Sequence, residues 1–415
     1  MGSLLLGIDL GKYHSQISVY DEKKKDIVSI SPYPLEDEGL IPTVLGVTTD
    51  KKRWLYGHEC ADFDGEKIDN ILDIIEKSEN FTVSGLDFTG GMILEKYLKK
   101  LLLLVRTQYP LDTIAKLVVT VEKKSEPIEE AVYLALEKLG IGKDRALLQS
   151  YEESYIAYAC SQKKELWTND VGLFDFNEKG LYYKQLSFNR ENKPMALYVF
   201  KKDYSESLRY EWLDNRMEKE KLSYIFLNLA KETLHKQNVS TIYVTGTGFR
   251  ESFASKVLPE LCMGRRVFMG YNLYAHGACR KAMELAGKRK IEPYIFMGED
   301  IISYNVYVPV YKNASNGYAV LSEFGSSWKE CHQEIEVILD DEEEVQIVVN
   351  DPLKKEEKMF IMSLEGLPKR PERMTRLNVS IEFFCEDEFV IRIKDMGFGN
   401  FYKSSSRIWE KRIEL

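Results

Sequence analysis

Cysteine and histidine are scarce in this sequence. Its 415 residues include six cysteines and five histidines, and no two cysteines form a C-x-x-C pair. This spacing argues against zinc ribbons and zinc fingers, whose metal ligands recur as such pairs. Scattered single cysteines are typical of reduced, mostly buried thiols, so we expect a cytoplasmic protein.

Long hydrophobic runs and a basic N-terminal segment are also absent. Apolar runs such as residues 101–105 and 195–200 fall far short of the roughly 20 residues that a membrane-spanning helix needs. The first apolar run, residues 4–8, follows no basic residue and stops at Asp9, which is unlike a signal peptide. We therefore expect no insertion into a membrane.

Positive charge is not in excess either. The chain has 57 Lys and Arg residues against 66 Asp and Glu residues, which gives a net charge of −9. A general binder of nucleic acid carries the opposite balance. Aromatic residues make up 12 % of the chain, but they are not interleaved with basic residues in the manner that stacks bases. Nucleic acid is therefore not an expected partner.

Common catalytic motifs are missing as well. The sequence has no G-x-x-x-x-G-K-S/T loop, no H-E-x-x-H and no G-x-S-x-G. The turn Gly246-Thr247-Gly248 lacks the third glycine of a dinucleotide fingerprint. The acidic run at residues 340–344 has no central glycine between alternating ligands, so it is typical of a solvated turn and not of a calcium loop.

What is present is a chain long enough for two to three domains. Residues 1–165 mix short β-branched runs with stretches in which apolar residues recur every three or four positions. These patterns predict strands at residues 4–9, 16–20, 26–30, 42–48 and 117–121, and helices at residues 91–108, 126–139 and 151–161.

A similar order of elements follows in residues 166–290. The patterns predict strands at residues 171–176, 181–188, 194–201 and 241–245, and helices at residues 212–236, 249–261 and 274–288. Two successive units of hairpin strands, helix, strand and helix predict a duplicated α/β lobe. We expect one lobe at about residues 1–165 and the other at 166–290.

Helical periodicity disappears beyond residue 290. Short strands separated by turn residues predict an all-β sandwich over residues 291–415, with strands at residues 301–311, 318–322, 334–339, 345–350, 359–364, 377–384 and 388–394. The apolar segment at residues 294–297 has two interpretations. It is either a linker that docks between the lobes or the first strand of the sandwich.

Turns at strand ends hold the residues best suited to chemistry. Asp9 ends the first strand and can hold a water of hydrated Mg²⁺, while Gly11 lets backbone N–H groups approach a phosphate. Asp175 has the matching place in the second lobe, and Glu153 begins a helix between the lobes. Gly246 lies between a strand and a helix, where the backbone can pack against a nucleotide. Each residue alone also has a structural explanation, because a strand-end Asp often caps a turn.

Taken in order, these motifs resemble the actin-like ATPase superfamily, and within it the seventy-kilodalton heat-shock chaperones of the DnaK type. Residues 7–11 (GIDLG) resemble the first phosphate motif, and residues 174–176 (FDF) stand where the second begins. Residues 244–250 (VTGTGFR) stand at the adenosine motif V-G-G-S-T-R. Weaker matches lie at residues 41–44 (IPTV), 56–57 (YG), 117–121 (LVVTV), 153–158 (ESYIAY) and 276–279 (HGAC).

The C-terminal strands extend the resemblance over nearly the whole chain. Residues 364–368 (LEGLP), 377–381 (LNVSI) and 389–391 (FVI) resemble the peptide-binding β-sandwich of these chaperones. The resemblance implies an actin-like, two-lobed, ribonuclease-H-like duplicated nucleotide-binding fold over residues 1–290, followed by the all-β sandwich over residues 291–415. The implied partner is a polypeptide that the β-domain binds.

The resemblance also implies ATP or ADP with Mg²⁺ as ligands. Asp9 and Asp175 would hold the metal through water, and Glu153 would help to orient the metal's water shell. The contacts to the phosphates and the adenosine would come from the remaining turn residues, which are Gly11, Lys12, Gly246, Thr247 and Gly248.

Departures from the family pattern keep a second function open. Lys12-Tyr13 replaces the Thr-Thr of the first phosphate motif, and residues 175–180 (DFNEKG) replace D-L-G-G-G-T of the second. Residues 208–240 are too few for the family's upper second subdomain, and no helical lid follows the sandwich. One hypothesis is an ATP-binding, chaperone-like protein that is at most a weak ATPase. The other is a catalytically inactive pseudo-ATPase that acts as a protein-binding scaffold. A sugar or acetate kinase of the same superfamily fits less well, because those kinases carry no such β-domain.

Overall fold

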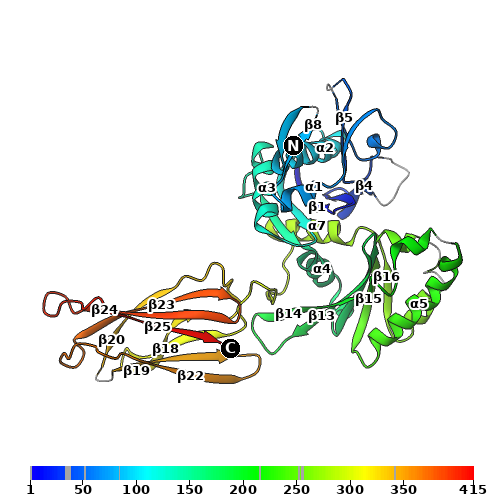
Figure 1. Ribbon diagram of the computed structural model, residues 1–415. Helices are drawn as coiled ribbons and strands as arrows, with labels where there is room; N and C mark the ends of the chain where they lie inside the picture. Colours follow the sequence, from blue (N-terminus) through cyan, green and yellow to red (C-terminus); the bar gives the residue numbers. More distant parts are fainter. Residues whose placement is uncertain are drawn as a thin grey trace. The chain divides into compact units, whose positions relative to one another are not determined.

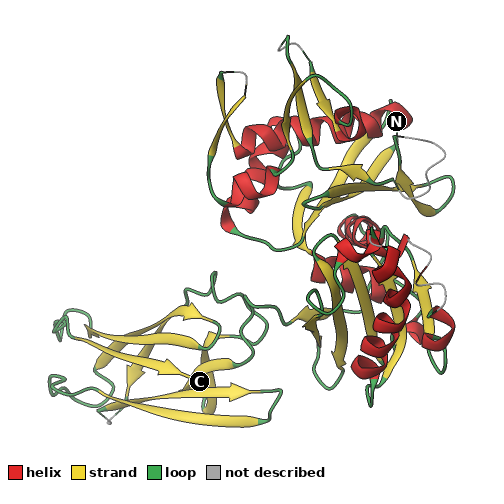
Figure 2. Ribbon diagram, turned by 45° about the vertical axis from the view of Figure 1, so that its right-hand side comes forward, coloured by secondary structure: helices red, strands yellow, loops and turns green. Residues whose placement is uncertain are grey.

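The protein is a mixed α/β chain with a strand-rich C-terminal region. The computed structural model describes residues 2–32, 39–50, 53–83, 85–214, 216–250, 253, 257–340 and 343–415. The chain divides into two compact units, Met1–Ser187 with Phe200–Glu292, and Phe188–Val199 with Pro293–Leu415. Residues 188–199, expected in the first part of the chain, thus belong to the second unit. All described helices lie in the first unit (Figure 2).

The first sheet of the first unit has the strand order β11-β10-β1-β2-β3. Strand β1 is parallel to β10, which is parallel to β11, whereas β2 is antiparallel to β1 and to β3. A short strand β4 pairs with β2. The bounds are β1 (Ser3–Leu10), β2 (His14–Asp21), β3 (Asp26–Ile30), β4 (Ile41–Pro42), β10 (Thr113–Val121) and β11 (Ala146–Ser150).

The second sheet has the order β16-β15-β12-β13-β14-β17. When β4 and β17 are left out, each sheet has five strands, and in both sheets they lie side by side in the order fifth, fourth, first, second, third along the chain. In both sheets the fourth and fifth strands are parallel to the first. The two sheets therefore share one topology. The bounds are β12 (Asp170–Asn177), β13 (Gly180–Asn189), β14 (Met195–Asp203), β15 (Val239–Thr245), β16 (Arg266–Met269) and β17 (Tyr294–Phe296).

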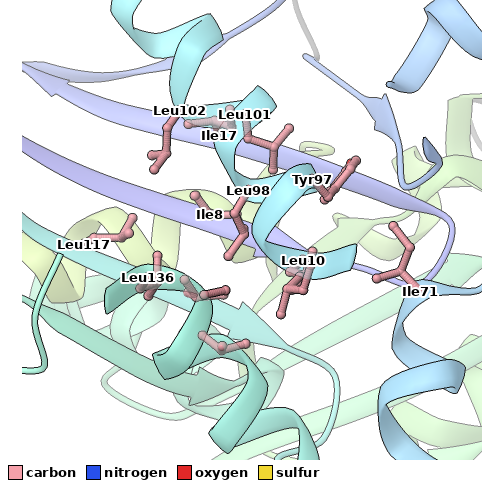
Figure 3. Packing of buried hydrophobic residues seen from close by; sticks show 14 of the residues in the cluster. Ile8, Leu10, Ile17, Ile71, Tyr97, Leu98, Leu101, Leu102, Leu117 and Leu136 are labelled. Atoms are coloured by element: carbon pink, nitrogen blue, oxygen red, sulfur yellow. The ribbon is translucent and has the colours of Figure 1, made fainter. Parts of the chain in front are cut away.

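Helices α1 (Ile71–Glu76), α2 (Gly90–Gln108) and α3 (Glu126–Lys138) pack on the first sheet through one apolar core. The Thr89 side chain accepts the N–H of Met92 and caps α2. In the close-up, Leu98 and Leu101 of α2 lie beside Ile8 and Ile17 of the sheet (Figure 3). The three-and-four spacing of apolar residues in α2 therefore forms the face that it buries.

Helices α4 (Tyr151–Cys160) and α7 (Leu273–Leu285) pack against each other, and α7 also lies along β1 (Figure 1). Two glycines permit these close approaches. A Cβ on Gly277 would lie 2.1 Å from the carbonyl oxygen of Ser154, and a Cβ on Gly7 would lie 2.3 Å from the backbone nitrogen of Cys279. Helix α7 comes from the second half of the unit yet packs on the first sheet, so it joins the two halves.

The second sheet is covered by α5 (Arg216–Leu234), which contributes Leu222, Phe226 and Ala230 to a separate core. The expected helix over 249–261 is described only as a 3-10 turn and the short α6 (Leu258–Leu261), and residues 251–252 and 254–256 lie outside the described residues. The remaining elements of the unit are β5 (Leu45–Thr48), β6 (Trp54–Tyr56), η1 (Gly57–Cys60), β7 (Gly65–Ile68), β8 (Asn80–Val83), β9 (Leu86–Thr89), η2 (Lys164–Leu166), η3 (Tyr210–Leu213) and η4 (Thr247–Arg250).

The second unit holds two four-stranded sheets around a third core. The first has the order β19-β18-β21-β22, and the second has the order β20-β23-β24-β25. Their bounds are β18 (Asn305–Lys312), β19 (Ser315–Ser322), β20 (Glu334–Leu339), β21 (Glu344–Asp351), β22 (Glu356–Ser363), β23 (Thr375–Cys385), β24 (Glu388–Gly397) and β25 (Ile408–Glu414).

Two strands at the ends of this region differ from expectation. Residues 294–296 do not open the sandwich, because β17 pairs in parallel with β14 and with neither four-stranded sheet. Strand β25 is missing from the prediction, because the consecutive charged residues 410–412 interrupt its hydrophobic signal, yet Ile413 is buried in the core. Among the described helices, none is long and apolar enough to cross a membrane.

Candidate functional site

One pocket of the first unit collects turns from both of its halves. It encloses about 640 Å³, part of which is open to solvent. The lining comes from the carboxyl ends of β1, β12 and β15, from the residue after β10, and from the first turns of α4 and α7. Ligands of α/β proteins commonly bind at this end of the strands. The lining residues used below are Asp9, Gly11, Lys12, His14, Glu122, Tyr151, Asp175, Asn177, Glu178, Lys179, Gly246, Thr247 and Tyr274.

Each half of the unit supplies to this pocket an aspartate that is hydrogen-bonded to a tyrosine. The hydroxyl of Tyr151 is hydrogen-bonded to Asp9, and the hydroxyl of Tyr274 donates to Oδ2 of Asp175 at 2.7 Å. The two tyrosine rings stack on each other with their centroids 3.9 Å apart. In both halves the tyrosine lies in the first turn of the helix that follows the fifth strand. The pair therefore fills the space between the two aspartates.

A buried ammonium group lies beside this tyrosine pair. The Nζ atom of Lys184 is 5.4 Å from the ring centroid of Tyr151 and equally far from that of Tyr274. It is also 3.1 Å from Oε1 of Glu152, which Lys201 approaches to 3.0 Å. Burial alone would raise the pKa of Glu152, but the two lysines lower it to about 2. Glu152 is therefore a fixed negative charge that holds Lys184 against the rings.

The two aspartates are both deeply buried. Burial raises the pKa of Asp9 to about 8, with the nearby Asp175 and Glu122 adding to the rise. Burial also raises the pKa of Asp175, although Lys184 and the bond from Tyr274 oppose the shift. The same burial and the adjacent carboxyls hold the pKa values of Tyr151 and Tyr274 well above the usual one, so both phenols are neutral donors.

The basic side chains that line the pocket already have acidic partners. Lys12 Nζ lies 2.7 Å from Asp73 Oδ2, and Lys179 forms an ion pair with Glu122. His14 Nδ1 lies 3.2 Å from Oε1 of Glu178, which also accepts the Thr247 hydroxyl at 3.1 Å. Burial would raise the pKa of Glu178, but its bonds with His14 and Thr247 lower it. Neither lysine is left to receive an anion.

The turn that begins at Gly246 is closed against the neighbouring strand. Gly246 has φ of +101°, and a Cβ there would lie 2.2 Å from the carbonyl oxygen of Phe176. A Cβ on Gly248 would lie 2.4 Å from the Phe176 ring, so Gly248 packs on that ring away from the pocket lining. These glycines are explained by packing on β12.

Two family models match this chain. Residues 26–299 match the C-terminal region of a family of unknown function, DUF5716, and residues 301–415 match a domain of unknown function, DUF8552. The chain belongs to the DUF5716 family. A comparison with curated proteins finds no match.

In this DUF5716 chain, most of the sequence-predicted site residues meet in the pocket. Asp9, Asp175, Gly11, Lys12, Gly246 and Thr247 all line it. Glu153 and Gly248 are not in the lining. The Glu153 carboxylate instead accepts the N–H of Ser150 at 2.6 Å, the Glu153 N–H donates back to Ser150 Oγ, and Lys124 lies 3.0 Å from the carboxylate. Glu153 thus caps α4.

Sequence reasoning missed the lining residues Tyr151, Tyr274 and Glu122, and Lys184 beside the two tyrosine rings. A signal existed for the two tyrosines, because each stands in the first turn of a helix at the same point of the repeated order. Nothing in the local sequence indicates that their rings meet, since 123 positions separate them along the chain.

The pocket residues do not fit Mg²⁺ with a nucleotide. Both expected metal-shell carboxyls accept a phenol hydroxyl, and within the described part of the chain no three His, Cys, Asp or Glu side chains gather as a metal site. A polyphosphate would also face the four carboxyl groups of Asp9, Glu122, Asp175 and Glu178.

Proposed function

We propose that this chain is a catalytically inactive relative of the actin-like ATPases that acts as a protein-binding scaffold. The shared strand order of its two sheets, with an aspartate near the end of the first strand of each, supports an actin-like ancestry. The observation that carries the loss of activity is the stacked pair of Tyr151 and Tyr274, bonded to those two aspartates.

Electrostatics support the same proposal. Phosphoryl transfer depends on positioning and on cations that neutralise the phosphate oxygens. Here the Lys12 ammonium lies on Asp73 and the Lys179 ammonium on Glu122. Glu178 stands in the turn where a nucleotide-binding relative has glycine. The two lysines that could neutralise a phosphate are therefore each paired with a carboxylate, and a carboxylate replaces a glycine of the phosphate-binding turn.

An apolar sheet face in the second unit supports polypeptide binding. Val320, Tyr307, Val348 and Met359 form one row of cross-strand neighbours on the sheet of β18, on the face opposite the core. Tyr307 and Val348 in the middle of the row are buried, and the exposed part of the face lies at its two ends. Tyr318 and Met359 on this face are 62 % and 56 % exposed. The outer face of the other sheet is instead lined with ion pairs, such as those of Arg392 with Glu382 and Glu410. Exposed apolar patches commonly mark protein contacts.

The first test is thermal unfolding of the full chain with and without MgATP or MgADP. A ligand that binds the folded state at one hundred times its Kd adds about 2.7 kcal/mol of stability. We expect no shift of the first unit's transition at millimolar nucleotide. A shift that Asp9→Ala abolishes would overturn the pseudo-ATPase proposal. It would favour the second candidate, an ATP-binding chaperone-like protein. The observation that supports this candidate is that one pocket brings together Asp9, Gly11, Asp175 and Gly246.

The second test addresses the sheet face. Fluorescence anisotropy with a labelled, extended apolar peptide would measure binding to the full chain. We expect the double variant Tyr318→Ser with Met359→Ser to weaken binding about tenfold or more. Ile338→Ser is the matched control, because Ile338 is 58 % exposed on the other sheet. Equal effects of the two changes, or no binding at all, would count against this surface.

A further inference from the structure

Strand β22 is an edge strand of its sheet, and half of its backbone groups face away from the sheet. The N–H of Leu364, the residue after β22, donates to the carbonyl oxygen of Glu343 at 2.8 Å, in the register of the antiparallel β21–β22 pair. Bonded and non-bonded residues alternate along such a pair. The even-numbered residues of β22 therefore bond to β21, whereas the odd-numbered ones, among them Met359 and Ile361, direct their N–H and C=O groups outward.

The outer edge of β22 is also apolar. Met359 and Ile361 are both exposed, and residues 359–362 contain no charge and no proline. Free sheet edges are usually protected from pairing by charged residues, prolines or bulges. The two edge strands of the other sheet follow this rule, because β20 carries two glutamates and β25 has three consecutive charged residues. Residues 359–362 lack such a protection of their own.

A lysine from the other sheet occupies one of the outward backbone groups. The Nζ atom of Lys411 in β25 donates to the carbonyl oxygen of Ile361 at 2.8 Å. Lys411 lies two positions before Ile413, which is buried in the core, so its side chain leaves β25 on the face that points toward the sheet of β22. The same Nζ atom lies 5.9 Å from the ring centroid of Phe360. Lys411 thus reaches across the open side of the sandwich to the edge of β22.

We infer that Lys411 blocks the outer edge of β22 and thereby keeps it from pairing with the β22 of a second copy of this chain. An added strand would bring a backbone N–H to the carbonyl oxygen of Ile361, and the Lys411 ammonium already holds that position. An inward-pointing charged residue is one of the ways in which proteins protect a sheet edge. The inference goes beyond the proposed function, because it concerns the edge of the sheet and not its face.

The sequence of β22 suits pairing with itself, which is why a second copy is the expected occupant of an unblocked edge. An antiparallel pair that sets Met359 of each copy opposite Ile361 of the other uses outward groups on both strands. A twofold axis relates the two copies in this arrangement, so the contact closes on itself. It places Lys358 opposite Met362 and Glu357 opposite a serine, so that no like charges face each other along the strand.

Sedimentation of the full chain tests the inference. Lys411→Met removes the ammonium and keeps an unbranched side chain, and we expect this variant to sediment with twice the mass of the native species as its concentration is raised. Lys411→Ala, which adds no apolar length, should act in the same way, whereas Lys411→Arg keeps a charged donor and should retain the native mass. Lys394→Met is the matched control, because Lys394 is an exposed lysine of β24 in the same sheet as Lys411. It should leave the mass unchanged.

A second substitution tests whether the association uses the backbone of the edge. Met359→Pro removes an N–H that points outward and that the pairing of β22 with β21 does not use, so an edge strand tolerates it. Added to Lys411→Met, it should return the protein to the native mass. Circular dichroism of each variant shows whether it is folded.

The outcomes separate this inference from the proposed function. The native mass for both folded variants, Lys411→Met and Lys411→Ala, overturns the inference. Association that Lys394→Met shares, or that Met359→Pro does not reverse, also overturns it, because the contact would then not be made by the edge of β22. None of these results decides whether the sheet face binds an apolar peptide or whether the first unit binds nucleotide. Failure of either of those tests leaves the role of Lys411 standing.

Discussion

At the scale of single residues, the buried carboxyl group of Asp9 in the pocket lowers the stability of the folded chain as the pH rises. Its pKa of about 8 in the folded chain lies above the ordinary 3.8. Between these values the unfolded chain loses the proton while the folded chain keeps it. Folded stability therefore falls as the pH rises from about 4 to about 8, and above that window the full loss remains.

Asp9→Asn should remove this pH-dependent loss, because the amide does not ionise and its oxygen can still accept the Tyr151 hydroxyl. We expect the variant to be more stable than the native chain by about 2–4 kcal/mol at pH 7 and by much less at pH 4. Urea unfolding of the first unit at both pH values measures the difference. Glu137→Gln, a change at an exposed acid of α3, should show no such dependence. A variant that is less stable at pH 7 than the native chain would contradict the prediction.

Residue types and local spacing predicted part of the site. The aspartates were found because each lies near the end of a buried strand, where a carboxyl can face a pocket. Glu153 was misplaced: its spacing from Ser150 is that of an S-x-x-E capping box, a pattern that indicates a helix start and that competes with a metal-shell role. The tyrosine pair could not be predicted, because stacking depends on how two halves of the unit meet.

At the scale of elements, the approach of α4 to α7 brings the two tyrosines together. Both helices begin at the pocket, and they touch through Gly277. Because the nearest atom to an added Cβ is the backbone carbonyl oxygen of Ser154, a side chain at this position must push the helices apart. The stacking distance between Tyr151 and Tyr274 depends on this contact.

Gly277→Ala should therefore destabilise the first unit by about 1–3 kcal/mol, as overpacking does. Gly91→Ala in α2 is the matched control, since a Cβ there has no neighbour closer than 3.8 Å. It should be neutral or stabilise by up to about 1 kcal/mol through helix propensity. Denaturant midpoints compare the two variants. A Gly277→Ala protein as stable as the control would show that α4 and α7 can separate freely.

Element prediction succeeded where the pattern was long and periodic. Strand β3 was placed at its observed bounds, and α2 and α3 within one residue at each end. It failed over residues 42–48, which form two strands because the chain turns after Pro42 to pair with different partners. The prediction also missed β6 to β9. These strands are short, and their residues show no alternation of apolar and polar side chains that would indicate pairing.

At the scale of the whole molecule, the two units hold separate apolar cores. Among the described residues, the core of the second unit shares no member with the cores of the first. The chain nevertheless passes from one unit to the other three times, because residues 188–199 belong to the second unit. Independent cores predict more than one unfolding event in a chain of this size.

Calorimetry should therefore resolve two transitions, and a core substitution in one unit should move only one of them. Leu98→Ala removes a fully buried side chain beside Ile8, and Ile391→Ala removes one from the second core. Each change should cost its own unit about 2–5 kcal/mol. The expected pattern is a lower midpoint for one transition and an unchanged midpoint for the other. The opposite outcome is a single transition whose midpoint both variants lower equally. It would mean that the unfolding of the two units is coupled through residues 188–199, which belong to the second unit but lie between two parts of the first unit along the chain.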